Sequence, residues 1–272
     1  DFAYIKKFLS GSFGWITAII LTMMCPISIS FYALGVATFF AIFFAKLLFG
    51  GFGNNIFNPA AVGRAVIFAT FVGASTDIIT MATPTTVIAS SYNWLVVDPE
   101  MITTMMDEIG GLPTLFTGMY PGAIGETSAL VILIVGIILS IRKVIDWRIP
   151  VVYLGSIFVL AMGIALFKGV GSYGSLPGFI WYPLLHLLTG GVMFGAVFML
   201  TDPVTSPTSA QGKCIFALGA AVLTVLIRIK ANLPEGCLYS ILLMNMLTPM
   251  IEQALAGKQL ALRKKHLLFL AV

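Results

Sequence analysis

The chain has 272 residues, of which 59% are apolar and only 10% are charged, and its formal net charge is +4 at neutral pH. A soluble domain carries roughly a quarter charged residues, so this composition excludes a water-soluble globular protein and predicts a polytopic membrane protein. The two histidines and the three separated cysteines, Cys25, Cys214 and Cys237, have no metal-ligand spacing, and no triad or carboxylate pair for hydrolysis stands out. We therefore expect no metal site, no hydrolytic centre and no nucleic-acid partner.

Eight apolar segments are candidates for membrane-spanning helices, because a helix needs about 20 apolar residues to cross the hydrocarbon core. In chain order they are 12–30, 31–49, 59–73, 124–141, 149–167, 179–200, 214–231 and 236–255. Cys25-Pro26 interrupts the first segment, and the third is short and begins at Asn58-Pro59. Short or broken helices often line a site in a membrane bundle. The expected fold is an all-α transmembrane bundle of about eight helices, a single domain over residues 1–272.

The basic residues indicate the orientation of this bundle. They lie before the first segment, around one short loop and after the last segment, as Lys6, Lys7, Arg142, Lys143, Arg148, Lys258, Arg263, Lys264 and Lys265. Cytoplasmic loops are enriched in Lys and Arg, so we expect both termini to be cytoplasmic. The acidic loop 74–123, which has no Lys or Arg, then lies outside the cytoplasm. Arg228 and Lys230 would fall near the outer face and violate this rule.

Two loops on the predicted cytoplasmic side share a weak sequence similarity. Residues 50–59 and 201–207 each follow an apolar segment, and each places Asn or Asp directly before proline, at Asn58-Pro59 and Asp202-Pro203. Structural repeats are common in membrane transporters, with sites at their interface. An internal repeat and two independently capped helix starts both stay open as interpretations.

The first of these loops also has residues suited to ligand binding. Its glycines let the backbone turn sharply or approach a ligand, and the amides of Asn54 and Asn58 offer both donors and acceptors. Arg64 follows inside an apolar segment, where a charge is usually paired or functional. The structural alternative for Arg64 is a side chain that reaches the headgroups from near the helix end.

A second polar segment, residues 121–128, opens the fourth candidate helix. Its two central glycines are followed by Glu126, Thr127 and Ser128. Backbone amides at such a helix start can bind an anion, and the same residues can equally serve as a helix cap with Glu126 in the first turn. We keep Gly125, Glu126 and Thr127 as candidate binding residues.

The stretch 74–84 lies just past an apolar segment and contains Asp77, Thr80, Ala82 and Thr83. Ser, Thr and Asp satisfy free backbone groups well, so one interpretation is a turn that caps a helix. The other is an acceptor sequence in which one hydroxyl is covalently modified.

Together these segments resemble the D subunit of the Rnf complex, a membrane-bound ferredoxin:NAD oxidoreductase, and the related B subunit of the sodium-translocating NADH:quinone reductase. The resemblance runs from about residue 39 to residue 252. It is carried by residues 46–60, 122–128, 201–205 and 233–236. Several dispersed motifs in the same order make the match specific.

In that family a flavin transferase attaches FMN through a phosphoester bond to a threonine, in a motif resembling Asp-x-x-Ser/Thr-Gly-Ala-Thr. Asp77, Thr80, Ala82 and Thr83 match this motif, which implies that Thr83 carries the FMN. Met81 stands where the family has glycine. A second, non-covalent flavin such as riboflavin is implied near residues 50–59, 122–128 and Asp202.

The resemblance implies a redox subunit of an ion-translocating complex in a bacterial or archaeal cytoplasmic membrane. Electrons would reach the FMN from an outer-side FMN-carrying subunit, while ferredoxin and NAD would bind to other subunits. Their flow would drive Na⁺ or H⁺ transport. The alternatives are a quinone-reductase B-type subunit, a cofactor-free transporter or channel, and a passive scaffold.

Overall fold

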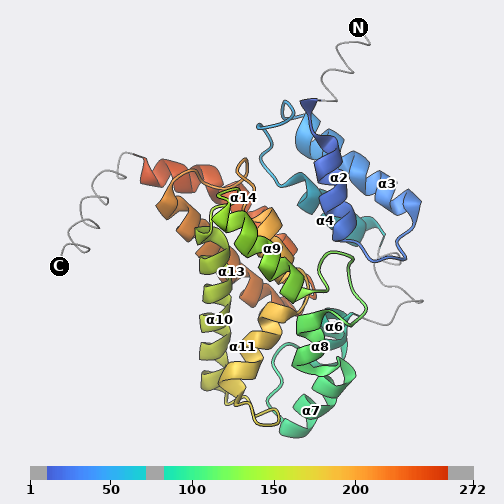
Figure 1. Cartoon of the computed structure of the whole chain (residues 1–272), viewed down its shortest axis with the longest axis vertical. Coiled ribbons are helices and arrows are strands. Elements are labelled where there is room, and N and C mark those ends of the chain that lie inside the picture. Colours follow the sequence, from blue (N-terminus) through green and yellow to red (C-terminus); the bar gives the residue numbers. More distant parts are fainter. Residues whose placement is uncertain (1–10, 72–82, 257–272) are drawn as a thin grey trace, which may run out of the picture.

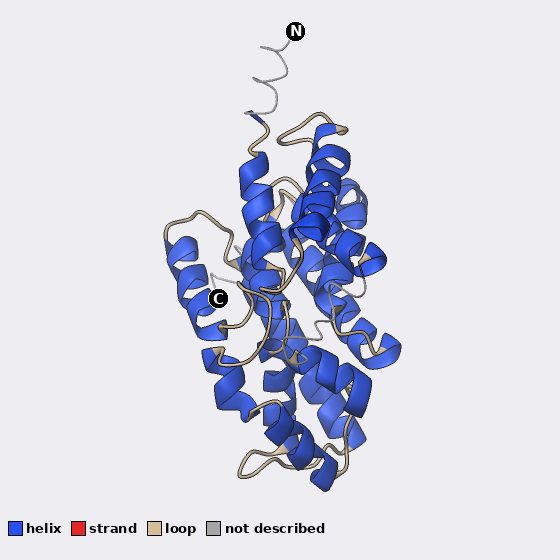
Figure 2. Cartoon of the chain, turned by 90° about the vertical axis from the view of Figure 1, so that its right-hand side faces the viewer, coloured by secondary structure: helices blue, strands red, loops and turns tan. Residues whose placement is uncertain are grey.

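The computed structural model describes residues 11–71 and 83–256, and all regular elements in these ranges are helical (Figures 1 and 2). In chain order the helices are α2 (Gly14–Met23), α3 (Phe31–Phe39), α4 (Pro59–Thr70), α6 (Pro84–Val87), α7 (Pro99–Glu108), α8 (Gly111–Thr117), α9 (Ala129–Ile141), α10 (Arg148–Lys168), α11 (Gly178–Leu188), α12 (Val192–Phe194), α13 (Ala210–Ala231) and α14 (Gly236–Leu255). Three π-helical segments, Phe40–Leu47, Ile88–Tyr92 and Gly195–Met199, continue α3, α6 and α12. The all-α prediction is confirmed.

Each of the eight apolar segments contains a helix, but their lengths differ from the prediction. Among the described residues, α10 and α13 are long and apolar enough to cross a membrane. A third span results if α11 and Val192–Met199, which are bent by 70° at a short break, are counted together. The apolar helices α2, α4 and α9 and the stretch 31–47 are shorter. The first segment, 12–30, is interrupted at Cys25-Pro26 as predicted, since α2 stops at Met23, and the next helix begins only at Phe31.

Polar side chains at the first turns explain where several helices begin. Ser30, Asn58, Ser128 and Ser209 accept hydrogen bonds from backbone N–H groups at the starts of α3, α4, α9 and α13. Such caps satisfy donors that have no partner within the helix. Pro59 follows Asn58 at the first position of α4, where its missing N–H costs nothing.

The core lies where α13 packs against α10 and α14 (Figure 1). Its fully buried side chains include Tyr153, Ile157, Phe194 and Phe216, and alanines along α13 let the helices approach closely. The helices α2, α3 and α4 pack against one another at the N-terminal end of the chain.

The loop that the sequence predicted between residues 74 and 123 contains three short helices in its described part. The helix α8 packs against α11, and buried side chains of this region, among them Trp94, Ile102 and Met105, form a second hydrophobic cluster with Trp181 of α11. The described part of this loop, residues 83–123, is therefore a packed layer at the ends of α10 and α11.

Candidate functional site

Thr83 forms the cap of α6. Its Oγ1 accepts a hydrogen bond from Thr86 N at 3.4 Å and lies 2.8 Å from Thr86 Oγ1 and 3.1 Å from Thr85 Oγ1. The side chain is half-buried. Asp77, Thr80 and Ala82 lie outside the described residues, so only the last residue of the predicted acceptor motif can be placed.

A small cavity of about 50 Å³ adjoins Thr83 and joins segments that are far apart in the sequence. Arg64 of α4, Glu126 and Thr127 of the loop before α9, and Glu235 before α14 line it together with Thr83. The structure thus brings together four of the predicted site residues, Thr83, Arg64, Glu126 and Thr127. Glu235 was not predicted.

Arg64 is a buried cation with donors to spare. The residue is only 6% exposed, its guanidinium lies 4.5 Å from the ring centroid of Phe68, and Nη2 contacts Glu235 Oε1 at 3.5 Å. Its Nε and Nη1 have no hydrogen-bond partner among the described residues. A buried guanidinium with free donors is costly unless an anionic or polar group completes it, so this geometry suits an oxyanion such as a phosphoryl group.

Glu126 is 8% exposed and lies in the loop between α8 and α9, two residues before the Ser128 cap. The alternative that it stabilises the first turn of α9 is therefore wrong. No hydrogen bond from a described residue reaches its carboxylate. Burial, and next the charge of Glu235, raise the pKa of Glu126 above its usual range, while Arg64 and Arg228 act in the opposite direction.

Gly125 is placed by backbone contacts rather than by a cavity. Its N–H donates to Met23 O at 2.7 Å, and the neighbouring Ile124 N–H donates to Cys25 O at 3.1 Å. These bonds tie the loop before α9 to the end of α2. Gly125 therefore positions Glu126 relative to α2.

The break between α11 and α12 forms another wall of the site. Gly190 has a φ of 64°, and a Cβ there would lie 2.8 Å from Thr85 Cγ2. A Cβ at Gly191 would lie 2.7 Å from Glu126 Oε1. Only glycine therefore fits at both positions while Thr85 and Glu126 stay in place.

Arg228 of α13 donates hydrogen bonds to backbone carbonyl groups at this break. The residue is 1% exposed, and its guanidinium donates to His186 O at 2.6 Å and to Thr189 O at 2.8 Å. It also lies 4.4 Å from the ring centroid of Trp94. Arg228 is thus a buried partner of backbone carbonyls, which explains how its charge is accommodated within an apolar helix. The sequence signal, a charge within an apolar segment, was present but was interpreted only as a topological violation.

Two further predicted residues, Asn58 and Asp202, line a second cavity, of about 450 Å³. The buried Lys46 also lines it, and Phe13, Phe52 and Phe198 form aromatic parts of the wall. Lys46 Nζ donates to Thr17 Oγ1 at 3.2 Å. Asn54 is exposed, donates to Gly50 O at 3.4 Å and is absent from the lining of this cavity.

The two loops with similar sequence, residues 50–59 and 201–207, meet at this cavity. Asn58 Nδ2 donates to Met199 O at 3.3 Å, while Asn58 Oδ1 caps α4. Asp202 instead closes a turn, in which its carboxylate accepts hydrogen bonds from Val204 N and Thr205 Oγ1. The loops therefore share a place in the fold but not a local structure, since Pro59 begins a helix and Pro203 does not.

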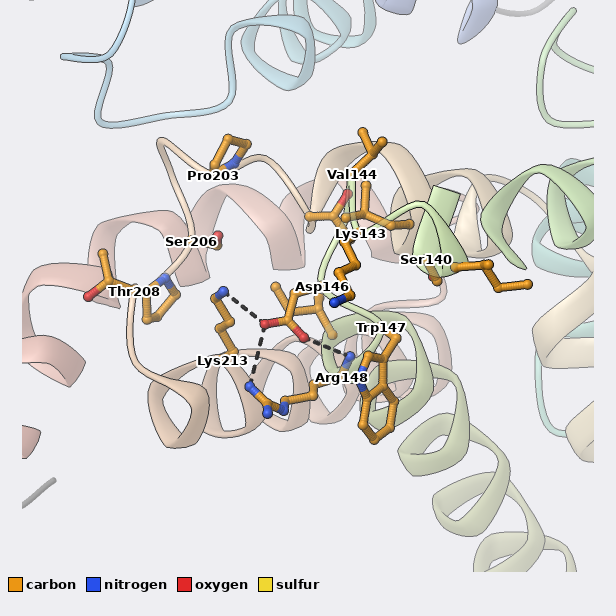
Figure 3. Close-up of a pocket in the computed structure, with 15 residues that line it drawn as sticks. Ser140, Lys143, Val144, Asp146, Trp147, Arg148, Pro203, Ser206, Thr208 and Lys213 are labelled. Carbon is orange, nitrogen blue, oxygen red and sulfur yellow. Dashed lines mark hydrogen bonds and ion pairs between the residues drawn. The ribbon is translucent and has the colours of Figure 1, made fainter. Parts of the chain in front are cut away.

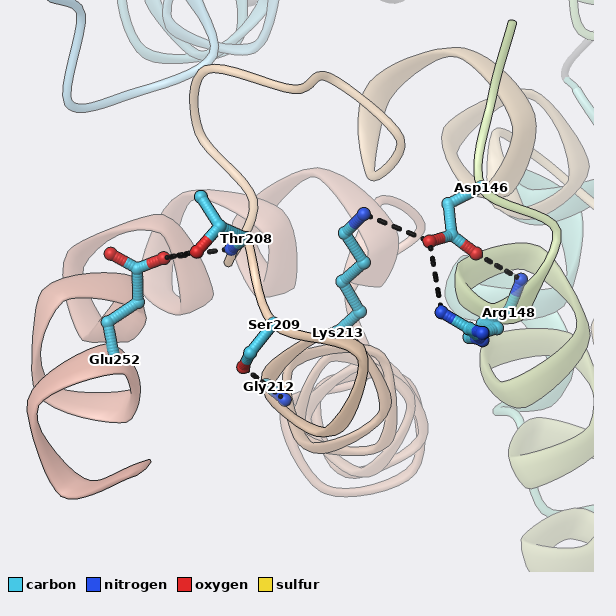
Figure 4. A network of polar contacts seen from close by, with 7 residues as sticks. All are labelled: Asp146, Arg148, Thr208, Ser209, Gly212, Lys213 and Glu252. Carbon is cyan, nitrogen blue, oxygen red and sulfur yellow. Dashed lines mark hydrogen bonds and ion pairs between the residues drawn. The ribbon is translucent and has the colours of Figure 1, made fainter. Parts of the chain in front are cut away.

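A third cavity, of about 660 Å³, lies beside the loop between α9 and α10 (Figure 3). Asp146 organises it by accepting from Lys213 Nζ at 2.9 Å and pairing with Arg148 at 3.6 Å (Figure 4). Partial burial alone would raise the pKa of Asp146, but the contacts with Lys213 and Arg148 lower this pKa overall. Glu252 accepts from both N and Oγ1 of Thr208 at 2.8 Å and thereby holds the turn before α13.

Comparison with known proteins relates the sequence of this chain to one family. The model of the NQR2, RnfD, RnfE family matches residues 5–260. The chain is 36% identical over 255 residues to the D subunit of the proton-translocating ferredoxin:NAD(+) oxidoreductase complex of Clostridium ljungdahlii, covering 88% of this chain and 72% of that protein. It is 37% identical over 251 residues to the D subunit of the Na(+)-translocating ferredoxin:NAD(+) oxidoreductase complex of Acetobacterium woodii, covering 88% and 69%. It is 31% identical over 265 residues to the B subunit of the Na(+)-translocating NADH-quinone reductase of Chromohalobacter salexigens, covering 93% and 60%.

Proposed function

Because the chain belongs to the NQR2, RnfD, RnfE family, we propose that it is the D subunit of an ion-translocating ferredoxin:NAD oxidoreductase complex. Its identity to two D subunits, 36% and 37%, exceeds the 31% identity to a quinone-reductase B subunit. Within the complex this chain carries FMN as a phosphoester on Thr83. Bound FMN supplies one- and two-electron redox chemistry, and the protein fixes its position and potential.

The observation that carries this proposal is the cavity shared by Thr83 and Arg64. A phosphodiester on Thr83 Oγ1 would carry a negative charge, and the unpartnered Nε and Nη1 of Arg64 are donors suited to it. Gly122 and Gly190 leave room without side chains of their own along the same wall. A cavity of about 50 Å³ accommodates a group of phosphoryl size but not a three-ring flavin. The ring system therefore belongs outside this cavity, where another protein of the complex can reach it.

We place this site on the outer side of a bacterial or archaeal cytoplasmic membrane, with both termini in the cytoplasm. The support is the distribution of basic residues, since no Lys or Arg occurs between residues 65 and 141. On that side, the electron comes from an FMN-carrying partner subunit. Ferredoxin and NAD bind to other subunits, and electron flow is coupled to Na⁺ or H⁺ transport.

A second, non-covalent flavin such as riboflavin fits the cavity of about 450 Å³ at the other ends of the helices. The aromatic walls of Phe13, Phe52 and Phe198 suit a planar ring, and the Asn58 amide, Asp202 and Lys46 surround it with polar groups. Asn54, being exposed, is left out of this site.

The test is in-gel fluorescence of the denatured chain under ultraviolet light, after coexpression with a flavin transferase. The wild-type chain should give a fluorescent band that Thr83→Ala abolishes. Thr85→Ala is the matched control, because its hydroxyl lies only 3.1 Å from that of Thr83 and its removal should leave the band intact. A dark wild-type chain would overturn the proposal and favour a cofactor-free transporter. A Thr83→Ala chain that stays bright would overturn Thr83 as the attachment residue. A passive scaffold instead predicts that Thr83→Ala leaves electron flow unchanged.

A further inference from the structure

The carboxylate of Glu126 is a charged group that the covalent attachment of FMN does not need. It shares the cavity with Thr83, is more than nine-tenths buried, and receives no hydrogen bond from a described residue. Buried carboxylates are normally paired or hydrogen-bonded, because burying an unpaired charge is expensive. Any further negative charge nearby raises the proton affinity of such a carboxylate, because protonation removes the repulsion between the two charges.

The nearby cations offset this charge only in part, since no ion pair or hydrogen bond from Arg64 or Arg228 reaches the Glu126 carboxylate. Arg64 contacts Glu235 at 3.5 Å, and Arg228 donates to the carbonyl oxygens of His186 and Thr189. The titratable groups that act on Glu126, or on which it acts, come from every element around it: Glu235, Arg64, Arg228, Tyr120, Cys25 and Cys237. Two carboxylates therefore face one cavity with a single arginine between them, and the arginine contacts Glu235.

An independent observation indicates that the cavity binds an anionic or polar group. Arg64 is itself buried and lines the cavity with two guanidinium nitrogens that have no hydrogen-bond partner in the described part of the chain. If Arg64 holds the phosphodiester on Thr83, as proposed above, its positive charge is shared still further and even less of it acts on Glu126. Glu126 is then the group in the site whose charge is least compensated.

We propose that Glu126 binds a proton when the flavin attached to Thr83 is reduced. This inference rests on the proposed function of Thr83. One electron arrives from the outer-side flavin of the complex, and one proton comes from water on the same side. The proton binds a carboxylate oxygen of Glu126 and forms a neutral carboxylic acid, so no other bond changes. When the electron passes on to the next redox carrier of the complex, Glu126 returns its proton to the water on the same side, and the net charge of the site stays constant through the cycle.

The experiment uses the assembled complex with Glu126→Gln, which has the shape of the protonated acid but cannot titrate. The midpoint potential of the covalent flavin is measured electrochemically at a series of pH values, together with the reduced-minus-oxidised infrared spectrum. In the wild type we expect a pH-dependent potential and a carboxylic-acid carbonyl band that appears on reduction. In Glu126→Gln the pH dependence should flatten and the band should be absent.

Two further variants keep the test sharp. Glu108→Gln is the matched control, because Glu108, the last residue of α7, is exposed and accepts a hydrogen bond from Tyr92, so the variant should behave as the wild type. Glu235→Gln removes the repelling charge and frees Arg64, so the pH-dependent range should shift to lower pH. This variant decides the question if Glu126→Gln does not assemble.

The outcomes separate this inference from the function it rests on. A fluorescent Glu126→Gln chain that keeps the pH dependence and the infrared band would overturn the role of Glu126. So would an unshifted Glu235→Gln variant. A wild-type chain without covalent flavin would instead overturn the proposed function.

Discussion

Arg228→Met should destabilise the folded protein more than any other removal of a single charge from α13. The substitution keeps most of the apolar length of the side chain but removes the guanidinium that serves the broken end of α11. The carbonyl oxygens of His186 and Thr189 then lose a donor at a depth where water does not replace it.

The magnitude follows from the contacts. An unsatisfied buried acceptor costs about 1–3 kcal/mol, and Arg228 serves two, at 2.6 and 2.8 Å. The guanidinium over Trp94 at 4.4 Å adds about 1–2 kcal/mol. Part of this sum is offset, because the variant no longer buries a charge. We expect a net loss of about 3 kcal/mol in the free energy of unfolding.

Thermal denaturation in one detergent, with parent and variants side by side, measures this loss. Lys230→Met is the matched control, because Lys230 carries the same charge two residues further along α13 and is less buried, so its removal should have little effect. Arg228→Lys should be intermediate, since an ammonium keeps the charge but not the fork that reaches both carbonyls. An Arg228→Met chain as stable as Lys230→Met would refute this account of the break.

Three other substitutions test separate parts of the fold and the site. Asn58→Ala should lower the free energy of unfolding by about 2 kcal/mol, because it removes both the cap of α4 and the hydrogen bond to Met199. Asn58→Ser should restore the cap alone, so equal losses in the two variants would contradict this two-part role. At the FMN site that we propose on Thr83, Arg64→Gln should lower the flavin fluorescence at least about tenfold, as expected for two lost charge-assisted hydrogen bonds, and full labelling would count against a phosphate contact. Asp146→Asn should destabilise by about 1 kcal/mol near neutral pH. Since the folded-state pKa of Asp146 is depressed, this difference is present above the unfolded-state pKa and vanishes as pH falls through the folded value; a constant difference in acid would contradict the ion pairs.

Most of the helices could be predicted because their signals are local. Apolar runs located all eight segments, and Asn58-Pro59 marked the start of α4 to the residue. The break after α11 was missed, since residues 179–200 form one continuous apolar run. The only local signal was Thr189-Gly190-Gly191, and glycines are common in membrane helices, so composition could not separate a break from close packing.

The candidate site was predicted as separate residues but not as one place. The acceptor motif indicated Thr83, and polar residues beside apolar segments indicated Arg64 and Glu126. Their meeting depends on long-range packing, because Arg64 comes from α4 and Glu126 from the loop before α9. Glu235 was interpreted only as part of a motif at a helix start, and its contact with Arg64 spans 171 residues of sequence.

The break between α11 and α12 connects the stability of the bundle to the chemistry of the site. Unwinding a helix within a membrane leaves carbonyl groups without partners, and it is tolerated only where other groups replace the lost hydrogen bonds. Arg228 supplies those bonds, and the unwound residues Gly190 and Gly191 then present a surface without side chains. Thr85 and the Glu126 carboxylate lie against that surface. Arg228 and the carboxylate of Glu126 therefore both depend on the break between α11 and α12. A change at Arg228 should therefore disturb the proton binding that we propose for Glu126, even though no hydrogen bond joins these two described residues.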